Sequence, residues 1–164
     1  MLAVPRPLQL ERILPMVSSL GISTLVLCGA NKVEKMYFGS HLFREPETLR
    51  AKLVEGLCQC GDTALPNVIV ARQLKRFLED DIDTLFPSDR WARVVAHPRR
   101  LGDMERYQRE LIRSVTCCPP ADTGVLVTVG PEGGWDEPYE LELLSAYGFQ
   151  VCAQVAGVER GYAV

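Results

Sequence analysis

Several features that would assign a protein to a particular class are missing from this sequence. No apolar run approaches the roughly 18 to 20 residues that a membrane span needs, and the opening stretch, MLAVPRPLQLER, lacks the long apolar segment of a secretory signal peptide. Internal repeats and low-complexity tracts are absent as well. We therefore expect a protein with no membrane partner that works in the cytoplasm or in an organelle matrix.

Metal ligands in a usable arrangement are also scarce. The chain has only two histidines, His41 and His97, and no pair of cysteines with the spacing Cys-x-x-Cys. Structural zinc sites are built from such closely spaced cysteines and histidines. The six cysteines are adjacent, one residue apart or isolated in apolar runs, which is typical of reduced and mostly buried thiols. The sequence predicts neither a metal site nor a disulfide framework.

The 164 residues, 47% hydrophobic and 24% charged, are typical of one globular domain with a sizeable core. The net charge of −3 is unevenly distributed, because seven arginines face only three acids between residues 90 and 113. These arginines are Arg90, Arg93, Arg99, Arg100, Arg106, Arg109 and Arg113. Guanidinium groups bind phosphates and stack on bases. The cluster indicates either an RNA contact or a solvated helix face with Glu–Arg pairs.

Stretches with helical periodicity alternate with short β-branched runs, which is typical of a parallel α/β sheet. We expect strands at residues 22–28, 67–71, 92–96, 124–129 and 149–154, and helices at 8–20, 46–60, 74–85 and 137–147. Residues 104–115 form a helix or a lid in this interpretation. Pro98 should end the third strand, and the apolar run at 124–129 indicates a strand buried on both faces. The predicted fold class is α/β, with a parallel five-stranded sheet flanked by helices.

The turn after the strand at 124–129 carries three glycines, a proline and an acid in five residues: Gly130, Pro131, Glu132, Gly133 and Gly134. In parallel α/β folds, ligands bind beyond the carboxyl ends of strands, where glycines let them approach the backbone. No Lys-Ser/Thr follows, as a Walker loop requires, and the spacing is not GxGxxG. Because Glu132 would repel a phosphate, an adenosyl ligand that carries a positive sulfonium fits this loop better.

The string VLVTVGPEGGWDEPYELELLSAYGF, at residues 125–149, closely resembles the signature of the ribosomal RNA small subunit methyltransferase E family. This resemblance implies a SPOUT (α/β-knot) fold, S-adenosylmethionine as cofactor and methylation of uridine N3 in small-subunit rRNA. The implied partners are ribosomal RNA or the small ribosomal subunit, and a second copy of the chain in a homodimer. Weaker similarity to the family's catalytic domain extends over nearly all of the chain.

The resemblance also assigns roles to individual residues. The cofactor-binding residues that it implies are His97, Gly130, Pro131, Glu132, Gly133 and Gly134. Arg160 is the implied catalytic residue, which orients or polarises the uracil. Given this family, the arginine cluster becomes an RNA contact, represented by Arg99, Arg100 and Arg106. Trp135 is expected in the core or at a dimer interface, and Glu137 and Glu140 as a charge pair at a helix start.

The sequence departs from the family pattern at both ends. Residues 1–164 correspond to the methyltransferase domain, and the family's amino-terminal RNA-binding β-barrel is not found. At the other end, only Arg160 matches the family's closing segment, Leu-Gly-x-Arg-Ile-Leu-Arg-x-Glu-Thr-Ala. Two interpretations stay open: a shortened product with lower cofactor affinity, or a non-catalytic dimeric RNA-binding or scaffold paralogue that keeps the knot-type fold.

Overall fold

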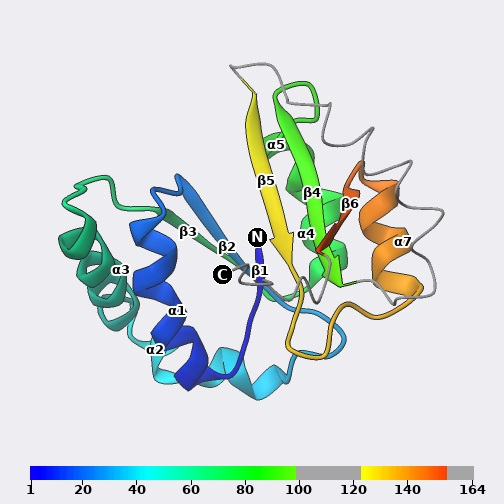
Figure 1. Cartoon of the computed structure of the whole chain (residues 1–164). Helices are drawn as coiled ribbons and strands as arrows, with labels where there is room; N and C mark the ends of the chain where they lie inside the picture. The colour runs from blue at the N-terminus through cyan, green and yellow to red at the C-terminus, as the bar shows by residue number, and fades with distance from the viewer. Residues whose placement is uncertain (99–122, 155–164) are drawn as a thin grey trace, which may run out of the picture.

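In the computed structural model, which describes residues 1–98 and 123–154, the strands form one parallel sheet (Figure 1). The sheet has six strands in the order β3-β2-β1-β5-β4-β6. Their bounds are β1 Leu2–Ala3, β2 Thr24–Cys28, β3 Asn67–Ala71, β4 Trp91–Pro98, β5 Gly124–Val129 and β6 Gln150–Gln154. The parallel α/β class with flanking helices is therefore confirmed.

The helices gather at the two ends of this sheet. In Figure 1, α1 and α3 lie beside each other next to β2 and β3, whereas α4, α5 and α7 lie next to β4 and β6. The helical segments are α1 Pro7–Ser19, the 3-10 helix η1 Lys35–Gly39, α2 His41–Arg44, α3 Pro46–Cys60, α4 Leu74–Asp80, α5 Ile82–Leu85 and α7 Tyr139–Ala146. Their arrangement leaves the loops that follow β2, β3 and β5 at the same edge of the sheet.

The sheet has one strand more than the sequence predicted. The additional strand, β1, is only two residues long and lies between β2 and β5, where it pairs Leu2 with Leu27 and with Val129. A two-residue strand shows no periodicity, so sequence patterns do not reveal it. By filling the middle of the sheet, β1 makes β5 an interior strand with a partner on each side.

The length of β4 and the burial of β5 differ from the prediction. Strand β4 runs over Trp91–Pro98 and is longer than the predicted 92–96, and its last residue, Pro98, pairs with Gln154 of β6. Proline lacks an amide donor but keeps its carbonyl, and it is tolerated at a strand end. In β5, buried and exposed residues alternate, and Val125, Val127 and Val129 are 43% to 48% exposed. The described residues therefore bury only one face of this strand.

The expected helices are present with small changes in their bounds. The segment 74–85 forms two helices, α4 and α5, with Asp81 between them. Helix α3 has the bounds predicted for it, and Gly61, which follows it in the left-handed conformation (φ 72°), ends it. At Gly56 of the same helix, a Cβ atom would lie 2.0 Å from the carbonyl oxygen of Pro15 in α1. This close approach of α1 and α3 builds the core next to β2 and β3.

The cysteines only partly follow the expectation of buried thiols. Cys28, at the end of β2, is buried, but Cys58 and Cys60 in α3 are exposed. Burial raises the pKa of the Cys28 thiol to about 12, so this thiol is neutral and unreactive at physiological pH. Within the described ranges, no helix is both long and apolar enough to cross a bilayer.

Candidate functional site

The glycine loop, residues 130–134, follows β5 and therefore lies at the carboxyl end of an interior parallel strand. Gly134 adopts a positive φ of 71°, which side chains rarely permit. A Cβ atom at Gly134 would lie 3.9 Å from Cε1 of His97, which lies near the end of the neighbouring strand β4. The structure thus brings together the glycine loop and His97, which lie far apart in the sequence.

Trp135 explains why the loop begins with a glycine. Its indole is only 1% exposed, and a Cβ atom at Gly130 would lie 3.0 Å from the indole Nε1. The indole therefore packs directly against the backbone of Gly130. Of the two places expected for Trp135, the core and a dimer interface, the structure confirms the core. The indole is not exposed to a partner.

A short segment after β2 fixes the loop from the other side. The ammonium group of Lys32 donates to the carbonyl oxygens of Gly133, at 3.1 Å, and Trp135, at 3.2 Å. The amide Nδ2 of Asn31 donates to the Asp136 carboxylate at 2.8 Å. An exposed ion pair between Arg6 and Glu132, at 3.4 Å, adds a contact to the start of α1. These contacts orient the loop's carbonyl groups.

Glu140 joins the same two segments from inside the protein. Its side chain is 2% exposed, and its two carboxylate oxygens accept hydrogen bonds from the backbone N–H groups of Asn31 and Asp136, both at 2.7 Å. A buried carboxylate is stabilised by such bonds. Glu140 is therefore more than the helix-start charge that the sequence predicted, since it links the loops after β2 and β5.

Glu137, the other member of the expected charge pair, contacts His97 instead. Its Oε1 lies 2.8 Å from His97 Nε2. His97 is 7% exposed, and its second ring nitrogen, Nδ1, is buried without a hydrogen-bond partner among the described residues. Thr128 Oγ1 and Trp135 Nε1 are also buried without a hydrogen-bond partner in the part of the chain that the structure describes. These three polar atoms lie at the end of β4, in β5 and in the loop after β5.

Arg93 does not belong to an RNA-binding surface, although it lies in the arginine cluster. Its side chain is buried and donates to the carbonyl oxygens of Phe86, at 2.7 Å, and Tyr147, at 2.7 Å. It also forms an ion pair with Asp83 at 2.5 Å. Because β4 alternates between the two sheet faces, Arg93 points into the protein and connects it to α5 and the end of α7.

Four other predicted site residues lie outside the described residues. They are Arg99, Arg100 and Arg106, the expected RNA contacts, and Arg160, the expected catalytic residue. The same holds for the segment that would complete a knot. Among the residues that the structure does describe, no group of three or more histidine, cysteine or acidic side chains is placed to hold a metal ion.

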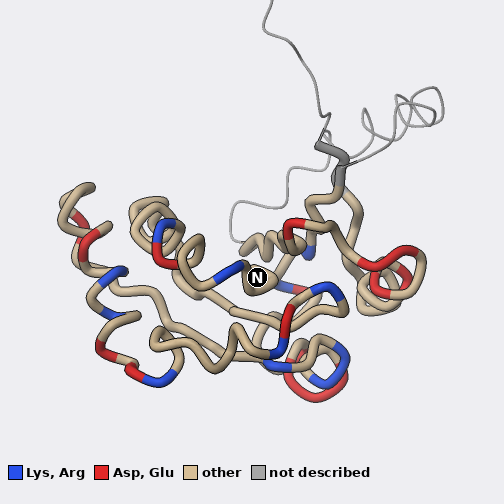
Figure 2. The backbone as a smooth tube through the Cα atoms, turned by 90° about the horizontal axis from the view of Figure 1, so that it is seen from below, with Lys and Arg blue, Asp and Glu red and all other residues tan. Residues whose placement is uncertain are grey.

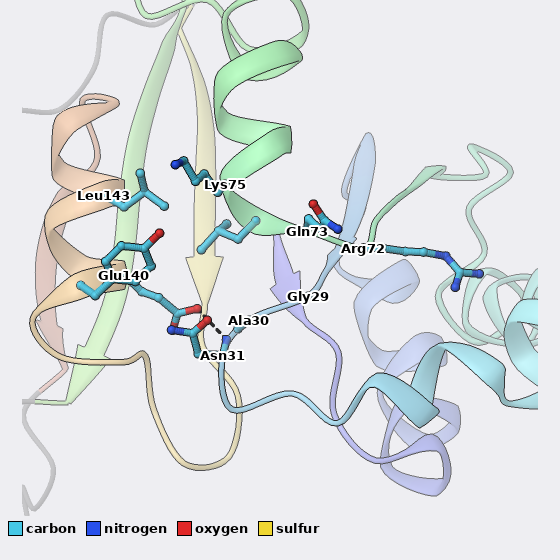
Figure 3. A pocket seen from close by; sticks show the side chains of 10 residues that line it. Gly29, Ala30, Asn31, Arg72, Gln73, Lys75, Glu140 and Leu143 are labelled. Carbon is cyan, nitrogen blue, oxygen red and sulfur yellow. Dashed lines mark hydrogen bonds between the residues drawn. The ribbon is translucent and has the colours of Figure 1, made fainter.

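Sequence reasoning missed a cavity at the same sheet edge, shown in Figure 3. It measures about 190 Å³ and lies between the segments after β2 and β3 and helix α7. The hydrogen bond between Asn31 and Glu140 closes its floor next to the glycine loop (Figure 3). The sequence analysis also did not predict that Asn31 and Lys32 position the glycine loop. The one feature of the sequence that could have indicated this role is their position just after a buried strand.

Comparison with known proteins identifies the family of this chain. A family model described as "RNA methyltransferase domain" matches residues 1–153. The Ribosomal RNA small subunit methyltransferase E of Treponema pallidum (strain Nichols) is 32% identical over 152 residues, which cover 89% of this chain and 50% of that protein. The chain thus spans about half the length of this curated relative.

Solved structures show the same fold. The Legionella pneumophila protein Lpg2936, in complex with the bound cofactor SAM, superposes with a TM-score of 0.66 at 16% identity and covers 96% of this chain and 58% of that one. A Ribosomal RNA small subunit methyltransferase E from Neisseria gonorrhoeae, bound to S-adenosyl methionine, gives 0.61 at 19% identity, with 95% and 57% covered. Because the family model spans nearly the whole sequence, this chain belongs to the family of RNA methyltransferase domains.

Proposed function

We propose that this chain is a methyltransferase that uses S-adenosylmethionine to methylate RNA, with N3 of a uridine in small-subunit rRNA as the target. The observation that carries the proposal is the glycine loop 130–134, held at the carboxyl end of interior strand β5 against His97. The named relatives supply the substrate class, and their similarity gives no support to a non-catalytic scaffold.

The residues around the loop fit an adenosyl ligand. The buried atoms His97 Nδ1 and Trp135 Nε1 have no hydrogen-bond partner among the described residues, and a polar ligand or an ordered water would satisfy them. Gly133 has only the flexible Lys32 side chain near its Cβ position, at 3.4 Å, so space is open beside it. Backbone groups of Gly130, Glu132, Gly133 and Gly134 then hold the adenosyl group, with His97 on the facing wall.

The protein's part in the reaction is mainly positioning. S-adenosylmethionine, when bound, supplies a sulfonium methyl group for transfer to a ring nitrogen. Uridine N3 must lose its imide proton and point its lone pair at that methyl, and negative charge develops on the uracil oxygens. Lys32 and Glu140 hold the loop that orients the cofactor. Arg160, carried over from the family pattern, stabilises the uracil oxygens.

We further propose that the chain acts as a homodimer on ribosomal RNA or the small ribosomal subunit, in the cytoplasm or an organelle matrix. Trp135, which the sequence placed in the core or at a dimer interface, is buried in the chain itself. Large exposed apolar side chains occur at α1, namely Leu8, Met16 and Leu20, and on β5, namely Val125, Val127 and Val129. Apolar surface of this kind favours self-association. Light scattering of the purified chain measures it directly.

Transfer of radiolabelled methyl groups from S-adenosylmethionine to small-subunit rRNA tests the activity. The wild-type chain should label the RNA, and digestion should place the label on uridine N3. Replacing Arg160 by Ala should lower the rate by about a hundredfold, since one charge-stabilising donor is removed. Arg12→Ala, an exposed arginine in α1, is the matched control. Absence of label with the wild-type chain, or equal rates in both variants, would contradict the proposal.

A further inference from the structure

The cavity of Figure 3 continues into a second one. The second cavity, of about 400 Å³, lies toward η1, and the two share the segments 29–31 and 72–73 at the carboxyl ends of β2 and β3. We call the pair the β2–β3 groove. It is lined by Gly29, Ala30, Asn31, Val33, Lys35, Phe38, Arg72, Gln73, Leu74, Lys75, Tyr139, Glu140 and Leu143.

The groove is lined by cations along its length. Lys75 lies at one end, Lys35 at the other, and Arg72 lines both cavities. Glu140 is the single acid among the lining residues, and both of its oxygens already accept backbone N–H groups. Figure 2, which views the backbone from below, shows Lys and Arg segments interspersed with Asp and Glu segments. The lining therefore attracts anions, whereas the chain as a whole is acidic.

Arg72 is held in place for such a role. In Figure 3 its side chain extends away from Glu140 and Lys75, toward the η1 side of the groove. There its guanidinium carbon lies 5.6 Å from the ring centroid of Phe38, within the range of a cation–π contact. The backbone beneath it is fixed too, because a Cβ atom at Gly29 would lie 2.2 Å from the carbonyl oxygen of Arg72. A preformed cation loses little entropy when it binds a ligand.

The end of the groove at α7 offers an aromatic surface beside the charges. Tyr139 is 50% exposed and Leu143 lines the same cavity. Proteins that bind single-stranded nucleic acid combine cations that follow the phosphates with aromatic side chains on which bases stack. The β2–β3 groove holds both elements, and its floor residue Asn31 contacts Asp136, which directly follows the glycine loop and Trp135.

We propose that the β2–β3 groove binds the single-stranded RNA segment that flanks the methylated nucleotide, with phosphates on Lys35, Arg72 and Lys75 and a base against Tyr139. The inference rests on the proposed function, because the occupant is the RNA substrate. It assigns substrate binding to three cations, Lys35, Arg72 and Lys75, that do not form a charge cluster in the sequence. The contacts of Asn31 and Lys32 with the loop after β5 place the groove beside the cofactor loop.

Fluorescence anisotropy of a labelled single-stranded oligoribonucleotide with the full chain tests this inference. Arg72→Glu and Lys75→Glu should each weaken binding by roughly tenfold, and each should lower the slope of log affinity against log salt by about 0.7, the value for one lost phosphate contact on a single strand. Lys52→Glu, the same charge change at a partly exposed position of α3 outside the groove, should bind as the wild type does. Thermal unfolding checks that all variants fold.

The outcomes separate this inference from the proposed function. Equal weakening by Lys52→Glu and Lys75→Glu, or wild-type affinity in both groove variants, would overturn the groove assignment. So would failure of the wild-type chain to bind the RNA, or equally tight binding of an acidic peptide of matched charge. Calorimetric titration with S-adenosylmethionine is the independent measurement, since the groove variants should keep wild-type cofactor affinity. If the wild-type chain shows no binding of S-adenosylmethionine, that result would count against the proposed function and not against the groove assignment.

Discussion

The loop after β5 and the loop after β2 meet at one edge of the sheet, but they carry different kinds of information in the sequence. The first contains a compact glycine motif that can be recognised without a structure. The second, residues 29–35, has no motif, yet Asn31 and Lys32 make most of the polar contacts that hold the first. A motif thus marks where a ligand is expected, and its geometry depends on residues outside it.

The largest effect should come from the buried link between the two loops. Replacing Glu140 by Ala leaves the N–H groups of Asn31 and Asp136 without their partner, and we expect a loss of about 3 kcal/mol in the free energy of unfolding. Urea denaturation measures it. Glu142→Ala, at an exposed position of the same helix, should change stability by less than about 0.5 kcal/mol. Similar values for both variants would show that Glu140 does not link the loops.

A smaller effect is expected inside the glycine motif. In Gly130→Val, the added Cβ atom would lie 3.0 Å from the Trp135 indole, so overpacking should cost about 2 kcal/mol. Gly133→Val is the matched control, because its nearest neighbour, at 3.4 Å, is the flexible side chain of Lys32. Thermal and urea unfolding of the two variants are compared. A control that loses as much stability as Gly130→Val would contradict the packing account.

The Lys32 contacts should contribute less. Lys32→Met keeps the length of the side chain and removes two hydrogen bonds to loop carbonyls, and we expect a loss of about 1 kcal/mol. Lys35→Met, in the same segment but lining the second cavity, should leave stability unchanged. Hydrogen exchange of the backbone amides in residues 130–136 should be faster only in Lys32→Met. Unchanged exchange would mean that Lys32 does not fix the loop.

The smallest effect is expected at the surface. The ion pair between Arg6 and Glu132 is 3.4 Å long, and both side chains are more than half exposed. Glu132→Ala should therefore change the free energy of unfolding by less than about 0.5 kcal/mol, and added salt should remove the difference. A destabilisation above about 1 kcal/mol would show that the loop depends on this pair.

The regular elements could be predicted because their signals are local. Helix α3 begins at a proline and ends at Gly61, and β2 is an apolar run, so periodicity and end signals locate both. Strand β1 could not be predicted, because its two residues are extended only through pairing with β2 and β5. The exposure of Val127 on β5 also depends on what covers each face of the sheet, which composition does not encode.

The candidate site was predicted in part for the same reason. The glycine motif is contiguous in sequence, and its place after a buried strand indicates a ligand loop. The direction of each arginine is not a property of the sequence alone. Arg93 and Arg72 both occur at strands of one sheet, yet the first is buried against carbonyl groups and the second is exposed on Phe38. The β2–β3 groove exists only after three distant segments fold together.

Calorimetric titration with S-adenosylmethionine, comparing the wild-type chain with Gly133→Val, tests the central claim most directly. If the glycine loop holds the cofactor, the wild type should bind one molecule per chain, and the variant should show no binding because the β-branched side chain fills the ligand's space. Its unfolding transition should stay near that of the wild type. Equal affinity of the two proteins would contradict the account and would show that the loop is only a turn between β5 and α7.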